Sequence, residues 1–370
     1  MRVHSLQLKS FRNYQEETVL FSPNVNVLFG DNAQGKTNLL EAIHLFSSGK
    51  SHRSNSDKDM ISYEADSAKL ILSYENKERS MESELRLFSG RQRKEMKQNG
   101  VKINKKKEWI GSFKSVLFYP EELNLVKEGP EGRRHFLDSA IGMLRPMYDH
   151  YTVVYQNALR QKSLLLRKIE DYPSYRKMIP VWNEYLAELG SRIVFYRQSF
   201  LRKMEPMVKE IVQDITSEKE ILDISYDSPF SDFKTVESIK SFFKEKQEEM
   251  KETEIRAKQV LIGPHRDDFL LMLNGKSAKS FASQGQQRSI VLALKLAQTR
   301  LIFEETGEYP VLLLDDIMSE LDSSRRRYLT ENTKEKQVII TCTDPEYVEL
   351  NRDVSYFRVE EGKVFPCTSI

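Results

Sequence analysis

The eight residues from Gly30 to Thr37 constrain the fold of this chain more than any other segment. They match the pattern GxxxxGK[ST] in full, as Gly30, Asp31, Asn32, Ala33, Gln34, Gly35, Lys36 and Thr37. A β-branched and aromatic run at 25–29 predicts a strand before them, and the apolar periodicity of 38–47 predicts a helix after them. Such a loop points its backbone N–H groups, and the positive end of the helix, at a bound anion. The sequence therefore predicts an α/β fold with a phosphate-binding loop.

The predicted ligand of this loop is ATP with Mg²⁺. In this pattern Lys36 reaches the β- and γ-phosphates, and the hydroxyl group of Thr37 ligates the metal.

A second signal is the apolar run 311–314, which ends in Asp315 and Asp316. This pattern is typical of a buried parallel strand whose carboxyl end faces a site. Asp315 is predicted to hold Mg²⁺, directly or through water, and Asp316 to orient or deprotonate the attacking water. The alternative is a core strand that ends at a solvated turn.

The segment 281–289, FASQGQQRS, indicates the class of nucleotidase. It resembles the LSGGQ signature of ABC-type ATPases, with Ser283, Gly285 and Gln286 in the matching places. A hydroxyl group, a glycine and an amide at the start of a helix can form a second anion site. Ser283 and Gly285 are thus predicted to bind nucleotide and Gln286 to be catalytic. The alternative is an ordinary polar helix cap.

Two further segments of this class follow. Residues 319–322, SELD, match the D-loop, although they could simply cap the predicted helix 323–329. ABC-type ATPases usually place a histidine after the strand predicted at 337–340, where this chain has Thr341 and Thr343 instead. Either threonine is a candidate for the missing hydrogen-bond donor.

A mainly helical region separates two strand-rich parts of the chain. The predicted ATPase lobe is discontinuous and comprises residues 1–125 and 259–370, and the inserted, mainly helical lobe comprises 126–258. Within the insert, periodicity predicts helices at 181–195 and 196–215, with Pro206 kinking or interrupting the second. The expected fold class is α/β: a P-loop ATPase resembling ABC and SMC heads, with an antiparallel β subdomain and no long coiled coil.

With these motifs in this order, the chain resembles the RecF family of bacterial recombination mediators, which are related to SMC heads. The similarity also includes LKSFRNY at the start, SHR at 51–53, GPEGRRHFLD at 129–138 and GPHRDD at 263–268. It extends over essentially the full length and is least specific near 230–255.

The resemblance implies a head that dimerises when ATP bridges two copies, with Lys36 and Thr37 of one copy and Ser283 and Gly285 of the other on one nucleotide. Arg12 and Asn13 match residues that reach the nucleotide. They could instead be polar residues at a strand end. Glu121 is a candidate for the position of the absent Q-loop glutamine. Asp316 is shorter than the glutamate of ABC transporters, which implies a slow, switch-like ATPase.

The family further implies double-stranded or gapped DNA as ligand, RecR as partner and RecO in the same pathway. It implies RecA loading at single-strand gaps, replication restart, support of the SOS response, and weak, DNA-stimulated ATP hydrolysis.

A basic hairpin is the predicted DNA-binding surface. Between residues 91 and 107 lie eight basic residues and one acid, Glu95, for a local charge of +7: Arg91, Arg93, Lys94, Lys97, Lys102, Lys105, Lys106 and Lys107. Asn99-Gly100 between them is a type I′ turn signal, and basic side chains on a hairpin suit phosphate contacts. The alternative is a solvated hairpin. Basic residues of the helical lobe are expected to be surface residues individually (Arg133, Arg134, Arg160, Lys162, Arg167, Lys168, Arg197, Arg202 and Lys203). Arg133-Arg134 belongs to the family-like block 129–138, and the alternative for this pair is a structural role.

Composition restricts the remaining classes. The net charge of only +2 means that a nucleic-acid role needs a local basic patch. Two cysteines without metal-ligand spacing, no apolar run long enough to span a membrane and a charged N-terminus predict a cytoplasmic protein. Two alternatives remain, an ABC transporter nucleotide-binding subunit and the head of another SMC-like complex.

Overall fold

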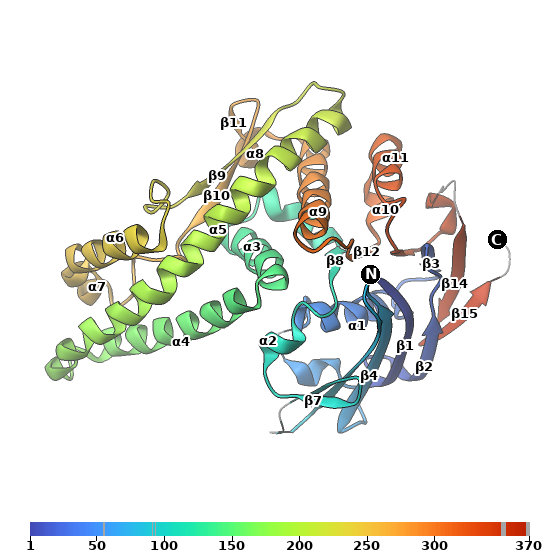
Figure 1. Ribbon diagram of the computed structural model, residues 1–370, viewed down its shortest axis with the longest axis horizontal. Coiled ribbons are helices and arrows are strands. Elements are labelled where there is room, and N and C mark those ends of the chain that lie inside the picture. Colours follow the sequence, from blue (N-terminus) through green and yellow to red (C-terminus); the bar gives the residue numbers. More distant parts are fainter. Residues whose placement is uncertain (55, 91, 93, 349–352, 368–370) are drawn as a thin grey trace. The chain divides into compact units, whose positions relative to one another are not determined.

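The computed structural model describes residues 1–54, 56–90, 92, 94–348 and 353–367. It forms two compact units (Figure 1). The first comprises Met1–Asn124, Glu210–Lys219 and Ser283–Ile370, and the second comprises Leu125–Lys209 and Glu220–Ala282. The lobe boundary drawn from the sequence at 258/259 falls inside the second unit. Strand β10 (Asp268–Leu273) explains this position, because it pairs with β9 (Leu222–Asp227) of the same unit.

A mainly parallel sheet carries the phosphate-loop motif in the first unit. Its order is β15-β14-β3-β13-β12-β8, and only β15 runs antiparallel to its neighbour. The strands are β3 (Val25–Phe29), β8 (Ser115–Phe118), β12 (Val311–Asp315), β13 (Val338–Cys342), β14 (Val354–Glu360) and β15 (Lys363–Cys367). The central strands β12 and β13 are buried along their whole length, as their continuous apolar sequences predict.

A second, antiparallel sheet forms the β subdomain of this unit. Its order is β2-β1-β4-β5-β6-β7. The strands are β1 (Arg2–Phe11), β2 (Tyr14–Leu20), β4 (Ser67–Glu75), β5 (Ser80–Phe88), β6 (Glu95–Gln98) and β7 (Val101–Ile103). Burial alternates along β4 and β5, so that one face of the sheet is covered.

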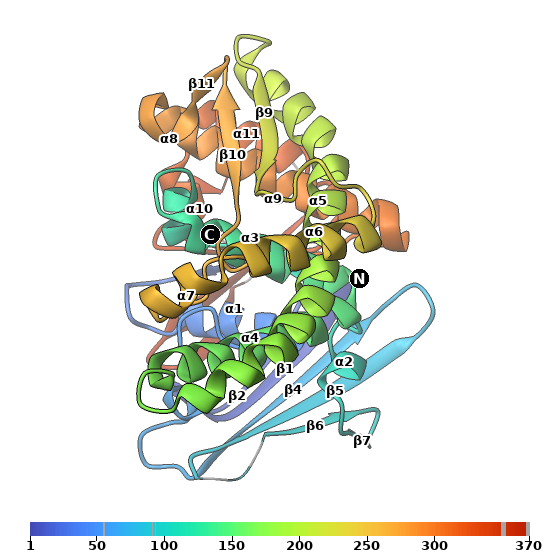
Figure 2. The ribbon, with the colours of Figure 1, turned by 90° about the vertical axis from the view of Figure 1, so that its left-hand side faces the viewer.

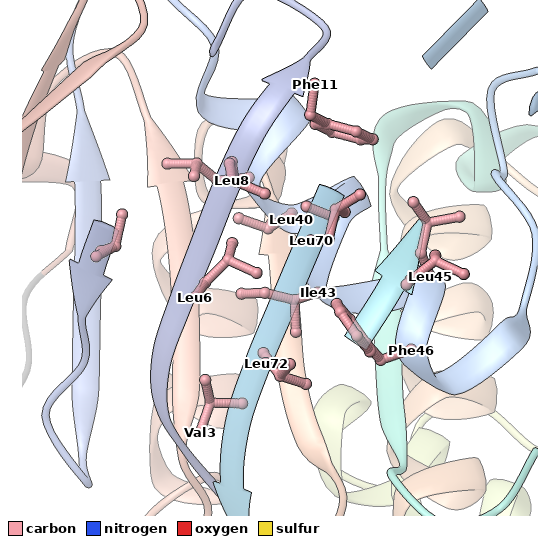
Figure 3. Close-up of a cluster of buried hydrophobic side chains, with 14 of the residues drawn as sticks. Val3, Leu6, Leu8, Phe11, Leu40, Ile43, Leu45, Phe46, Leu70 and Leu72 are labelled. Atoms are coloured by element: carbon pink, nitrogen blue, oxygen red, sulfur yellow. The ribbon is translucent and has the colours of Figure 1, made fainter. Parts of the chain in front are cut away.

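Helix α1 (Lys36–Ser48) joins the two sheets through one core. Figure 3 shows Leu40 and Ile43 of this helix among Leu6 of β1 and Leu72 of β4. The same cluster includes residues of the parallel sheet, such as Leu313 of β12. Because α1 starts directly at the phosphate loop, this core fixes the position of the loop.

The remaining elements of the first unit connect these layers. They are η1 (Asp57–Met60), α2 (Lys106–Trp109), η2 (Pro120–Val126, whose last residues belong to the second unit), α9 (Gln284–Thr306), α10 (Ile317–Glu320), α11 (Ser323–Glu331) and η4 (Pro345–Tyr347).

The second unit is mainly helical. Its elements are α3 (Pro130–Leu144), α4 (Pro146–Lys168), η3 (Pro173–Met178), most of α5 (Ile179–Thr216), α6 (Val236–Glu249), α7 (Lys251–Ala257), α8 (Ala278–Phe281) and the sheet β11-β10-β9, with β11 at Lys276–Ser277. Figure 2 shows β9 and β10 side by side. The two helices predicted at 181–195 and 196–215 are one continuous helix, α5, and Pro206 lies inside it without ending it. No helix in the described part of the chain is long and apolar enough to cross a membrane.

Three of the basic residues expected at the surface are buried in ion pairs within this unit. Arg133 binds both carboxylate oxygens of Asp268, each at 2.7 Å. The Nζ of Lys162 lies 2.5 Å from Glu254, and the side chain of Lys162 has no exposed surface. Arg197 binds Asp138 at 2.8 Å and the carbonyl oxygen of Pro264 at 2.6 Å. The first two pairs join α3 and α4 to the segment 254–268, and Arg197 joins α5 both to α3 and to Pro264 of that segment.

The Lys162–Glu254 pair predicts a strongly asymmetric response to mutation. We expect Lys162→Met to lower the free energy of unfolding by about 3–5 kcal/mol, because it leaves Glu254 charged and buried without a partner. The double variant Lys162→Met/Glu254→Gln should recover much of that loss, since the neutral amide can still accept from the N–H of Leu261 (2.8 Å). Urea denaturation checks both variants. Equal loss in the single and double variants would contradict this account.

Candidate nucleotide-binding site

The phosphate loop has a backbone that requires its two glycines. Gly30 has φ +145° and Gly35 has φ +117°, both in the region that disfavours L side chains. A Cβ atom on Gly30 would lie 2.4 Å from the carbonyl oxygen of Val359, and one on Gly35 would lie 2.7 Å from the side chains of Asn13 and Tyr14. The close approach of β14 and of the β1–β2 turn therefore excludes any larger residue at these positions.

Lys36 lies over this loop and is mostly buried. Its Nζ donates to the carbonyl oxygens of Gly30 (2.6 Å) and Asp31 (2.7 Å). Burial lowers the pKa of Lys36, and the nearby Asp316 opposes that shift. The ammonium group is thus held by neutral oxygens rather than by a carboxylate, which leaves its charge for a phosphate.

The predicted metal ligands are brought together from distant parts of the chain. The Thr37 hydroxyl donates to Asp315 Oδ1 at 2.9 Å, although 278 positions separate the two residues. The Thr341 hydroxyl donates to the same oxygen at 2.7 Å. Asp315 is only 5% exposed, and burial raises its pKa against these two hydrogen bonds. A hydroxyl and a buried carboxylate fit Mg²⁺, which prefers oxygen ligands and would favour the charged carboxylate.

Asp316 marks the abrupt end of strand β12. Its φ of +51° turns the chain into α10, and its N–H donates to the Thr341 hydroxyl at 3.0 Å. Its side chain is half-buried, and burial raises its pKa, opposed by a hydrogen bond from Ser319. The carboxylate therefore lies beside Asp315 at the carboxyl edge of the sheet, where the sequence predicts a general base.

Arg12 and Asn13 lie at the loop in different ways. Asn13 donates to the carbonyl oxygen of Gln34 at 2.9 Å and so contacts the loop directly. Arg12 binds both oxygens of the fully buried Glu41 at 2.9 and 2.8 Å, and the carbonyl oxygen of Asp59 at 2.6 Å. Its contact with nucleotide stays a prediction.

Glu41 of α1 is a functional residue for which no single sequence motif assigns a role. It also accepts from Ser51 at 2.5 Å, so that the SHR segment is tied to α1. Arg53 of that segment donates to Asn38 at 2.8 Å. The signals for these residues in the sequence were two family-like blocks, GDNAQGKTNLLEAI at 30–43, which includes Asn38 and Glu41, and SHR at 51–53.

The signature segment forms the N-terminus of the long helix α9. Ser283 and Gln286 make a reciprocal capping box: the N–H of Ser283 donates to Gln286 Oε1 at 2.7 Å, and the N–H of Gln286 donates to the Ser283 hydroxyl at 3.3 Å. Ser283 is exposed, and Gly285 is half-buried. Both interpretations of this segment are therefore compatible: it caps a helix and presents that helix end to solvent.

The D-loop is attached to the signature helix in the same chain. Asp322 caps α11 by accepting from the N–H of Arg325 at 2.9 Å, and it forms an ion pair with the Arg325 guanidinium. Arg325 also donates to Ser289 at 2.8 Å, and Arg288 pairs with Glu320 at 2.7 Å.

Glu122, rather than the candidate Glu121, is the acid that the core holds near β8. It lies 2.6 Å from Lys295 of α9, whose Nζ also donates to the carbonyl oxygen of Leu117 at 2.7 Å. Burial raises the pKa of Glu122. Glu121 is exposed, and Thr343 is exposed as well, whereas Thr341 is fully buried beside Asp315.

The basic hairpin exists as predicted, but its charge is partly neutralised. Strands β6 and β7 pair across Asn99-Gly100, whose φ values of +48° and +78° fit a type I′ turn. Each described basic side chain has a carboxylate partner: Lys94 with Asp57, Lys97 with Glu84, Lys102 with Glu95 and Lys105 with Glu108. Arg91 and Arg93 lie outside the described residues, as do the side chains of Lys106 and Lys107.

Comparison with known proteins identifies the family. The family model described as RecF/RecN/SMC N terminal domain matches residues 2–364. "DNA replication and repair protein RecF" of Acetivibrio thermocellus is 39% identical over 99% of this chain and 100% of its own length. The protein of the same name from Clostridium tetani is 40% identical over 98% of this chain and 99% of its own length. This chain belongs to the RecF family.

Solved structures agree with the RecF assignment. A structure of the recombination mediator protein RecF-ATP in the RecFOR pathway has a TM-score of 0.90 and 31% identity, covering 99% of this chain and 98% of that chain. The RecF-ATPrS structure has a TM-score of 0.92 with 31% identity, covering 98% and 97%. An Smc head from Pyrococcus furiosus, at 16% identity and a TM-score of 0.56 over 99% and 96%, shares the fold alone. The predicted fold class, an SMC-head-like α/β ATPase, is confirmed.

The Thr37–Asp315 contact predicts different effects for two substitutions of Thr37. We expect Thr37→Val to destabilise the chain by about 1–3 kcal/mol, because the buried Asp315 loses a hydrogen-bond donor. It should also abolish any dependence of ATP affinity on Mg²⁺. Thr37→Ser keeps the hydroxyl group and serves as the control, with a smaller effect on both quantities. Thermal unfolding and ATP titration with and without Mg²⁺ measure them, and a Val variant as stable as the Ser variant would contradict the role of this contact.

Proposed function

We propose that this RecF-family chain is a slow Mg-ATP-dependent switch that dimerises on ATP and grips DNA. The observation that carries the proposal is the junction of Thr37, Asp315 and Thr341 at the carboxyl edge of the parallel sheet. It lies next to Lys36 and Asp316, so phosphate-binding, metal-binding and water-activating groups meet in one place. In this proposal Lys36 binds phosphate, Thr37 and Asp315 hold Mg²⁺, and Asp316 orients the attacking water.

The second half of each site comes from a second copy of the chain. The exposed start of α9 offers a hydroxyl group, a glycine and the positive end of a 23-residue helix. These are the features that stabilise an anion at a helix N-terminus. Ser283 and Gly285 would therefore bind the nucleotide held by the partner's loop, and Gln286 would support hydrolysis there. The short Asp316 side chain supports slow turnover.

The family supports a proposal for the biological role. The relatives are DNA replication and repair proteins, and the RecF structures belong to the RecFOR pathway. We propose that ATP closes the dimer on duplex or gapped DNA in the cytoplasm, and that DNA stimulates a weak ATPase activity which reopens it. With RecR as partner, and RecO in the same pathway, the dimer would promote RecA loading in gap repair, replication restart and the SOS response.

The proposed DNA surface includes fewer residues of the hairpin than the sequence alone suggests. Lys94 and Lys97 have close acidic partners at 3.2 Å, which weakens their share in phosphate binding. Lys105 has an exposed side chain and only a long contact of 3.9 Å with Glu108. It and the adjoining Lys106 and Lys107 are therefore the best candidates, with Arg91 and Arg93 as further ones.

A hydrolysis-deficient variant tests the switch. We expect Asp316→Asn to reduce ATP hydrolysis by about 100-fold or more, since the amide cannot accept a proton. ATP should still bind, and the molar mass from light scattering should double on addition of ATP. A variant that binds ATP but stays monomeric would refute the shared-site mechanism.

Ser283→Arg is the matching variant for the opposite side of the site. The bulky side chain blocks the start of α9 but leaves the phosphate loop intact. ATP should bind to the monomer, while dimerisation and hydrolysis are lost. Mixing Ser283→Arg with Lys36→Ala should restore at most one complete site per dimer.

Salt dependence tests the hairpin. We expect the triple change of Lys105, Lys106 and Lys107 to Gln to weaken DNA binding and to lower the slope of log K against log salt by about 2–3, because each lost phosphate contact removes about 0.9. The control is the same change at Lys244, Lys246 and Lys251, which have carboxylate partners in α5 and α6. If the two triple variants behave alike, the hairpin is not the main DNA surface.

A further inference from the structure

A small cavity in the second unit is lined by several arginine residues and by no acidic residue. It has a volume of about 470 Å³ and lies among α3, α4 and the segment 259–266. Arg134, Arg167 and Arg266 line it, and no aspartate or glutamate does. Arg167 and Arg266 are exposed, so the cavity is open to solvent.

Neutral groups position two of the three arginines, Arg134 and Arg266. Arg134 donates to the carbonyl oxygen of Asp267 at 2.8 Å. Arg266 donates to Gln259 Oε1 at 3.1 Å and to the carbonyl oxygen of Val260 at 3.3 Å. Within the described part of the chain, none of the three forms an ion pair with a carboxylate. None of the three charges is therefore neutralised by an ion pair among the described residues, and the guanidinium groups of Arg134 and Arg266 are also held in place by hydrogen bonds.

Two arginines close to this cavity are, by contrast, paired with acidic residues. Arg133, next to Arg134 in α3, binds both oxygens of Asp268. Arg197 lines a neighbouring cavity of about 780 Å³ that also contains Glu128, Glu131 and Asp138, and it is paired with that aspartate. The neighbouring cavity shares Arg134 and His265 with the first, but its three acids disfavour an anion.

His265 also lines the cavity, and its imidazole ring is held in one orientation and is uncharged. Its Nδ1 accepts from the hydroxyl group of Tyr155 at 2.8 Å, and its Nε2 lies 3.2 Å from the carbonyl oxygen of Val260, which makes Nε2 the protonated nitrogen. Burial lowers its pKa to about 4, and Arg266 and Arg134 contribute to that shift. The positive charge of the cavity thus belongs to the arginines alone.

We propose that this cavity binds a phosphate monoester, either on a free nucleotide or at the end of a DNA strand. Arginine matches phosphate oxygens in paired hydrogen bonds. A monoester carries about −1.5 to −2 charges at neutral pH, closer to three unpaired guanidinium groups than the single charge of a carboxylate or of a backbone diester. The volume lies in the range of small-ligand pockets and suits an end group rather than a continuous duplex. This site is separate from the phosphate loop and does not depend on the proposed switch.

Calorimetric titration of the full chain with dTMP, and with thymidine as the uncharged control, tests the proposal. We expect dTMP to bind and thymidine not to bind. Arg167→Gln/Arg266→Gln should weaken the dTMP affinity by about 10-fold or more, because charge-assisted hydrogen bonds are lost. Lys168→Gln is the matched control, since Lys168 is exposed on the same helix but does not line the cavity. It should stay within about twofold of the wild type.

Two further measurements separate binding from folding and identify the source of the phosphate. ATP binding at the phosphate loop and the melting temperature without ligand should be unchanged in the double variant, whereas dTMP should raise the melting temperature of the wild type more than that of the variant. A duplex with a 5′-phosphate that binds more tightly than its 5′-hydroxyl counterpart, through these arginines, identifies a DNA end. Equal binding of the two duplexes identifies a free nucleotide. Absence of dTMP binding, or an equal loss in Lys168→Gln, overturns the proposal.

Discussion

One buried carboxylate, that of Asp315, holds the functional part of this fold together. It accepts hydrogen bonds from Thr37 at the start of α1 and from Thr341 at the end of β13. The parallel register pairs Asp315 with Thr341 and Thr341 with Leu28, so that three strand ends meet at one edge. Burying this charge is costly, and its pKa rises accordingly. The fold retains it because the two hydroxyl groups satisfy its oxygen and a cation can complete the compensation. Without this junction, the phosphate loop, the predicted metal ligands and the predicted general base Asp316 would no longer be held at one edge of the sheet.

Local sequence signals predicted the parts of the site that depend on backbone conformation. The strand at 25–29 is found within the same bounds, and the helix after the loop starts two residues earlier than its periodicity suggested. The Asn99-Gly100 turn was also predicted, because positive φ at two successive residues restricts the residue types. Helix α5 was divided at 195/196, since nothing in the local pattern shows that packing carries a helix through that point and past Pro206. The partner of Arg12, Glu41, belongs to an apolar helix face, where periodicity gives no reason to expect a charge.

Charge is the property that the linear sequence predicted least well. The hairpin was counted as +7, but Glu84 of the adjoining strand β5 pairs with both Lys97 and Lys69. Lys162 and Arg197 were expected at the surface and are buried in ion pairs, and the same holds for Arg133, for which a structural role was the alternative. In each case the acid lies on another element, so only the tertiary fold shows the neutralisation. For Arg134, Arg167 and Arg266 the fold instead concentrates positive charge. They are separated in sequence, and only the fold shows that they line one cavity.

Side-chain contacts between α9, which carries the signature segment, and the D-loop suggest how the two nucleotide sites of the proposed dimer are coupled. Arg325 joins Asp322 to Ser289 of α9, and Arg288 joins the same helix to Glu320. The signature end of α9 and the segment after Asp316 are therefore linked by side-chain contacts within one copy. In the proposed dimer, a phosphate bound by the partner's loop would act on Ser283 and, through α9 and α11, on the segment that follows this copy's own Asp316. Since a ligand shifts a conformational equilibrium only by its differential affinity, this connection would let each nucleotide favour the closed state of both sites in the proposed dimer.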